Sequence, residues 1–70
     1  MRLERLTKCF SYLDNLRNSG ITNMWGASSY LARAMRLESK EASSVLGSWM
    51  KTFDANKPAA VRAQEALNAQ

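Results

Sequence analysis

The sequence predicts an all-α protein: a compact three-helix domain with a helix-turn-helix-like arrangement over residues 1–54, then a linker and a short Ala-rich C-terminal helix over 55–70. Apolar residues recur at helical spacing in three successive segments, which is the pattern of amphipathic helices. Gly, Asn and Ser cluster between the first two segments, and the one proline, Pro58, stands where a last helix would begin. A chain of 70 residues fits one small domain with little core to spare.

The first two helices are predicted over residues 2–17 and about 28–36. Asn18-Ser19-Gly20 ends the first helix, because Gly20 suits the left-handed conformation at a helix C-terminus. Thr22 or Asn23 then caps the next helical segment. Gly26 is a weak helix former, so the residues from 24 form either a single turn before a fresh start at Ser28 or Ser29, or one continuous helix. One side of the first helix carries the apolar residues Leu3, Leu6, Phe10, Leu13 and Leu16, with Cys9 and Tyr12 inside or beside it.

The third helix is predicted from a Ser39 cap to about Phe53, and the last from Pro58 to about residue 68. The segment 31–49 has the spacing of two short helices folded around a tight turn, with Arg36 where such a turn commonly has Gly. The last helix offers little for packing, so we expect it to fray or to dock on a partner. The predicted core stripe of the third helix is Ala42, Val45, Leu46, Trp49, Met50 and Phe53, and the last helix contributes Ala60, Val61, Ala63 and Leu67.

Composition excludes several classes of function. There is no His, and Cys9 is alone, so neither a disulfide within the chain nor a zinc site is expected. No phosphate-binding loop, acid pair or catalytic cluster is visible, which predicts a protein that is not an enzyme and needs no cofactor. No apolar run is long enough for a membrane span or signal peptide. We therefore expect a cytoplasmic protein, in a host cell's cytoplasm, without membrane or metal partners.

The basic charge and the third helix supply the candidate binding residues. The net charge of +4 comes entirely from residues 1–36, which permits nucleic-acid contact but also fits an ordinary solvated surface. Gly47 in mid-helix costs about 0.8 to 1 kcal/mol relative to Ala. Three explanations are open for a glycine at this position: close approach to DNA, close packing of a partner helix, or a residue that is merely tolerated. The predicted DNA-binding residues are Arg33, Arg36, Lys40, Ser43 and Ser44, and those of a protein interface are Trp25, Ser43, Gly47, Ser48 and Lys51.

A family resemblance covers about residues 12–53, carried by the runs YLDNLRNSGITNMWGASSYLARAM and EASSVLGSWMKTF. They resemble a group of short helical proteins, of unassigned function, that are encoded in tailed-bacteriophage genomes. The resemblance implies a phage or prophage origin and a small helical domain, and it carries over no activity or site. The first hypothesis is therefore a phage-type regulatory protein that binds DNA. The second is a protein-binding module that inhibits or redirects a host bacterial protein, and the third is a virion or assembly component. A homodimer is possible.

Overall fold

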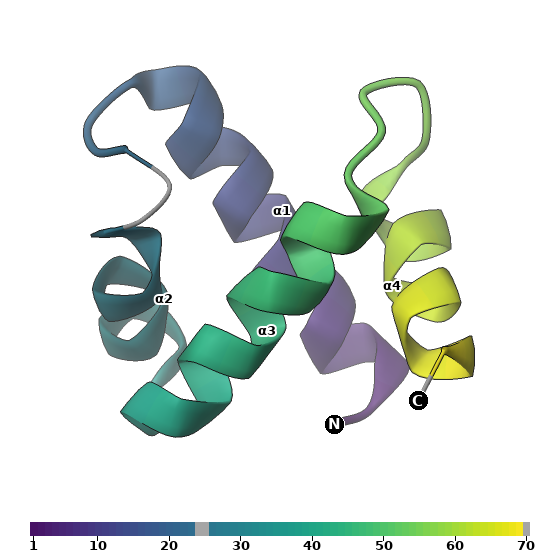
Figure 1. Ribbon diagram of the computed structural model, residues 1–70, viewed down its shortest axis with the longest axis horizontal. Helices are drawn as coiled ribbons and strands as arrows, with labels where there is room; N and C mark the ends of the chain where they lie inside the picture. Colours follow the sequence, from purple (N-terminus) through teal and green to yellow (C-terminus); the bar gives the residue numbers. More distant parts are fainter. Residues whose placement is uncertain (24–25, 70) are drawn as a thin grey trace.

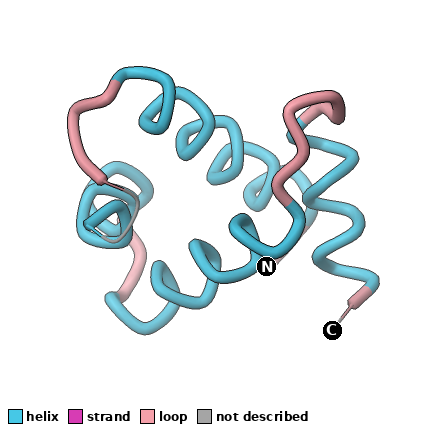
Figure 2. Tube along the Cα trace, turned by 45° about the horizontal axis from the view of Figure 1, so that its top comes forward, coloured by secondary structure: helices cyan, strands magenta, loops and turns pink. Residues whose placement is uncertain are grey.

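Four helices make up the regular structure of the part of the chain that the computed structural model describes, residues 1–23 and 26–69. They are α1 (Leu3–Ser19), α2 (Ala27–Met35), α3 (Ser39–Thr52) and α4 (Ala59–Asn68). In Figure 1, α3 crosses in front of α1, with α2 on one side and α4 on the other. Figure 2 shows loops as the only connections between the helices over these residues, so the predicted all-α class is confirmed.

The core forms where one side of each helix meets the others. Phe10, Leu13 and Leu31 are completely buried, and Trp49 is 3% exposed, as the apolar spacing predicts. Alanines lie between them at positions where helices pack closely, because a methyl group lets two backbones approach. Met50, predicted for the same stripe, is exposed, since it lies on the flank of α3. The buried cluster comprises Leu6, Cys9, Phe10, Leu13, Leu16, Ala27, Leu31, Ala42, Val45, Leu46, Trp49, Ala63 and Ala66.

The helix ends follow local chemistry, with some departures from prediction. Gly20 has φ 69° and ψ 12°, the left-handed conformation predicted for it, although α1 continues to Ser19. Arg36 ends α2 in the same region, with φ 55° and ψ 49°, and is the non-glycine residue of positive φ in the described chain. Ser39 does not cap α3: Glu38 occupies the cap position and its side chain makes no capping bond. Pro58 likewise precedes α4 as its cap residue.

The C-terminal helix packs within the chain, against α1 and α3. Ala63 and Ala66 belong to the common core, and Leu67 is half-buried against it. Ala60 and Val61, which we expected to pack, are exposed. The helix is rotated so that Arg62, rather than Val61, turns inward. The expectation that this helix frays is therefore wrong.

The connector before α2 is described at its two ends. The Gly26 backbone N–H donates to the Asn23 carbonyl at 3.2 Å and to its side-chain Oδ1 at 3.0 Å. Gly26, not Thr22 or Asn23, is the cap residue of α2, which begins at Ala27, and no side chain caps the helix. The predicted turn at residues 24–25 lies outside the described residues, as does Trp25.

Candidate nucleic-acid interface

Three basic side chains surround the connection between α2 and α3. Arg33 is exposed on α2, facing away from the buried Ala27 and Leu31. Arg36 is exposed in the turn, and Lys40 is exposed in the first turn of α3. The ion pairs of the described residues are Lys57–Glu65 and Arg62–Asp14, so none of these three cations is engaged there. The site therefore presents positive charge to solvent on both sides of one tight turn.

A fourth cation, Arg5 of α1, holds this turn in place. One of its terminal nitrogens donates to the Met35 carbonyl at 2.6 Å. Carbonyls in the last turn of a helix lack helical partners, and a cation there also offsets the negative end of the helix dipole. Sequence analysis did not identify Arg5, because the bond joins residues 30 positions apart. It ties the end of α2 to α1 and adds positive charge beside the turn.

Acidic side chains also lie near this surface. Glu38 is exposed in the turn, and Glu41 is exposed in the first turn of α3. Acidic residues at the N-terminus of a helix are stabilised by its dipole, which accounts for Glu41 without a binding role. A shallow depression is lined by Glu38, Lys40, Glu41 and Ser44. The charge at the turn is thus mixed, with the basic excess on the α2 and turn side.

The outer face of α3 is built from small residues. Ser43, Ser44 and Gly47 are exposed, opposite the buried Ala42, Val45, Leu46 and Trp49. A Cβ added at Gly47 would meet no atom within 4 Å. No contact within the described chain therefore requires glycine there.

The rest of the predicted protein interface continues along the same face. Lys51 is exposed near the end of α3, and Ser48 is half-buried. Ser48 and Lys51 line a shallow groove between α3 and α4 together with Thr52, Ala66 and Ala69. The structure thus brings four of the five predicted interface residues onto one helix, and Trp25 lies outside the described residues.

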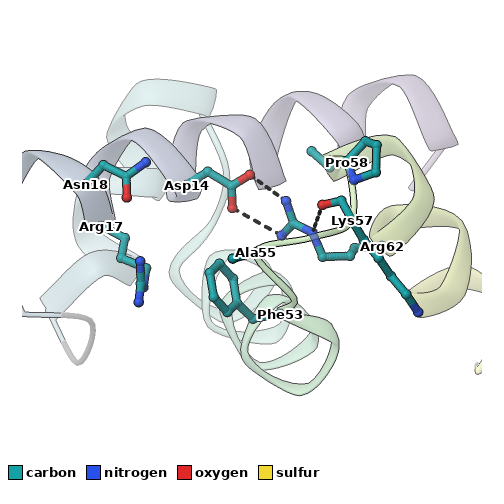
Figure 3. A pocket seen from close by; sticks show the side chains of 9 residues that line it. Asp14, Arg17, Asn18, Phe53, Ala55, Lys57, Pro58 and Arg62 are labelled. Atoms are coloured by element: carbon teal, nitrogen blue, oxygen red, sulfur yellow. Dashed lines mark hydrogen bonds and ion pairs between the residues drawn. The ribbon is translucent and has the colours of Figure 1, made fainter.

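A second polar cluster, which the sequence did not predict, joins α1, α3 and α4 (Figure 3). Arg62 is 2% exposed, and its two terminal nitrogens donate to the Asp14 carboxylate at 3.1 and 2.5 Å. The Arg62 Nε–H donates to the Lys57 carbonyl at 3.0 Å. The Trp49 indole N–H donates to Asp14 at 2.9 Å. The Asp14 carboxylate thus connects three helices. Its two hydrogen bonds with the buried Arg62 guanidinium neutralise the positive charge of that side chain.

The aromatic ring of Phe53 is part of the same cluster. The Arg17 guanidinium lies 4.7 Å from the ring centroid and that of Arg62 lies 5.4 Å from it. The Trp49 ring is 5.0 Å away at a tilt of 51°. In Figure 3 the ring stands between the two guanidinium groups. These contacts fix the start of the loop between α3 and α4.

The one cysteine does not have the environment of a nucleophile. Cys9 is completely buried, and burial raises the pKa of its thiol. Arg5 lowers that pKa by a smaller amount, and Glu41 raises it slightly further. A reactive cysteine needs a lowered pKa and access to solvent. Cys9 therefore acts as a small apolar core residue.

The described part of the chain offers neither a metal site nor a membrane-spanning helix. It contains no group of three or more His, Cys, Asp or Glu side chains placed to hold a metal ion. None of its helices has the length and apolar character needed to cross a bilayer.

Comparisons with protein-family models, with curated proteins and with solved structures found no match.

Proposed function

We propose that this chain is a small, non-enzymatic DNA-binding regulator in which α2 and α3 act as a helix-turn-helix unit. The observation that carries the proposal is the set of exposed cations Arg33, Arg36 and Lys40 around the α2–α3 turn. They lie beside a helix face made of small polar side chains, where a duplex can approach closely. The resemblance to phage-encoded proteins adds a phage origin, and with it the cytoplasm of a bacterial host, to the proposal.

The chemistry assigns different tasks to the two groups of residues. Arg33 and Arg36 would contact phosphates, which position a protein on DNA and make its affinity depend on salt. Lys40, Ser43 and Ser44 would face the major groove from the first half of α3, where hydroxyl and ammonium groups donate to base edges. Gly47 has open space above its Cα, so a longer basic side chain at this position would extend toward the phosphates without displacing the helix.

Binding to a fluorescent duplex, measured by anisotropy over a range of salt concentrations, tests this function. Replacing Arg33, Arg36 and Lys40 together by Ala should lower the slope of log affinity against log salt by about 2 to 3 units. The matched control replaces Arg2, Lys8 and Lys57, which are exposed cations outside α2 and α3, and removes the same charge. The control should retain most of the affinity and keep the fold. Absence of duplex binding by the parent chain at about 50 mM salt and tens of micromolar protein would reject the proposal.

A protein partner is the second candidate, and the solvent-facing Gly47 is the observation that favours it. A glycine that no intramolecular contact requires fits a face on which another helix packs, from a host protein or a second copy of this chain. Gly47→Arg separates the two functions, because Arg favours a helix over Gly by most of a kcal/mol and adds positive charge. Duplex affinity should hold or rise. Loss of biological activity with duplex affinity preserved would instead assign the face to a protein.

A further inference from the structure

A small cavity lies beside the Asp14–Arg62 cluster, at the opposite end of α3 from the α2–α3 turn (Figures 1 and 3). Its volume is about 190 Å³. A water molecule occupies about 30 Å³ in the liquid, so the cavity has room for a small polyatomic ion with some of its hydration. Its polar and aromatic walls come from α1, from the α3–α4 loop and from α4: Asp14, Arg17, Asn18, Phe53, Lys57 and Arg62.

Each charged side chain that lines the cavity has an oppositely charged partner, except Arg17. The Asp14 carboxylate is paired with Arg62, which donates both terminal nitrogens to it. The Lys57 ammonium is paired with Glu65 at 2.8 Å, and this pairing raises the pKa of Lys57. No ion pair or hydrogen bond in the described chain engages the Arg17 guanidinium. One positive charge is thus left uncompensated on a concave surface.

An aromatic ring lies against this charge. The Arg17 guanidinium lies over the Phe53 ring, and Phe53 in turn packs against Trp49, one helical turn earlier in α3. A guanidinium that lies over an aromatic face keeps its N–H donors in its own plane, where they are available to a ligand. Asn18 also lines the cavity, and its side-chain amide makes no hydrogen bond within the described chain. The N–H donors of Arg17 and Asn18 are therefore available at the edge of an open cavity.

We propose that this cavity, which we call the Arg17 pocket, binds an oxyanion: a carboxylate or a phosphate group. Arg17 supplies a bidentate fork and the compensating charge, Asn18 supplies an amide donor, and Phe53 forms the wall that orients the guanidinium. The pocket is separate from the surface proposed for DNA, so its occupancy is measured without nucleic acid. Failure of one proposal leaves the other standing.

The test is a titration of the full ¹⁵N-labelled chain with sodium phosphate and, separately, with sodium acetate. Sodium chloride holds the ionic strength constant, so that screening alone produces no change. The proposal predicts saturating shifts of the Arg17 side-chain Nε–H and of the Asn18 and Ala55 amides, with a dissociation constant of about 1 to 10 mM, as expected for a small ligand. Saturation with phosphate alone, or with acetate alone, identifies which group the pocket takes.

Two variants of equal charge decide whether the site is the one proposed. Arg17→Gln should weaken binding about tenfold, the usual effect of losing a charge-assisted bidentate contact. Arg2→Gln removes the same charge from an exposed position at the start of α1 and should change the dissociation constant less than about twofold. Shifts that stay linear up to about 50 mM anion, or that weaken equally in both variants, would overturn the proposal. The amides of Phe10 and Leu31 in the core report that each variant is folded.

Discussion

The buried ion pair between Arg62 and Asp14 gives the sharpest stability prediction. Arg62→Met keeps a long apolar side chain but removes the guanidinium, leaving the Asp14 carboxylate with the Trp49 indole as its remaining donor. Removing one partner of a buried pair costs about 3 to 5 kcal/mol. The side chain of Asp14 is 27% exposed, so water compensates part of the loss and we expect about 3 kcal/mol. That is a large fraction of the total of about 5 kcal/mol expected for a domain this small.

Urea unfolding followed by far-ultraviolet circular dichroism measures the effect, with Lys57→Met as the matched control. Lys57–Glu65 is an ion pair between exposed side chains, for which a loss of less than about 1 kcal/mol is usual. The double variant Asp14→Asn with Arg62→Met removes both charges and keeps an acceptor for the indole. It should be more stable than the sum of the single effects predicts, by at least about 1 kcal/mol. If Arg62→Met costs no more than Lys57→Met, the pair does not hold the three helices together.

Three further predictions concern single residues. Gly47→Ala should raise the free energy of unfolding by about 0.8 to 1 kcal/mol, since the added methyl group meets nothing; an unchanged urea midpoint would contradict the open geometry. Arg36→Gly should stabilise the chain by about 1 kcal/mol, because the left-handed conformation costs a non-glycine residue about that much. The same variant should bind a duplex more weakly, because it loses one positive charge. Burial raises the pKa of Cys9, so the folded chain holds the thiol proton more tightly than the unfolded chain. Stability should therefore fall as pH rises above about 8.5, and by a smaller amount in Cys9→Ala, as urea midpoints at about pH 7 and pH 10 would show.

The elements that the sequence predicted are those with strong local signals. The apolar spacing of α1 and α3 is regular enough to place Phe10, Leu13 and Trp49 in the core. Gly20 could be assigned a left-handed conformation because few other residues adopt it readily. The cap predicted at Ser39 is wrong because serine is as acceptable in the first turn of a helix as at its cap, and the choice depends on where the preceding turn ends.

The features that the sequence did not predict depend on contacts between distant residues. Arg62 and Lys57 balance Glu65 and Asp54 in a local count of charge, and nothing near Arg62 in the sequence indicates burial. Its partner Asp14 is 48 positions away, and only the packing of α4 against α1 brings the two together. The contact of Arg5 with α2 also joins distant residues, 30 positions apart. Both arginines, although their residue type is typical of a solvated surface, hold two helices together.

The candidate interface was predictable only as a surface. The exposure of Arg33, Lys40 and Ser44 follows from the periodicity that buries the opposite faces of their helices. Which molecule contacts them depends on shape and charge outside this chain. The assignment to DNA therefore stays a prediction, derived from unpaired cations beside a face of small residues.

The most direct test of DNA binding is a map of which backbone amides respond to a duplex. In a ¹⁵N titration with duplex DNA at about 50 mM salt, we expect the largest shifts between Arg33 and Gly47, with the exposed face of α1 around Lys8 unchanged. Shifts should diminish together as salt rises, because phosphate contacts release counterions. Shifts centred on α1 or α4, or no shift at any duplex concentration, would contradict the assignment of α2 and α3 as the DNA-binding unit.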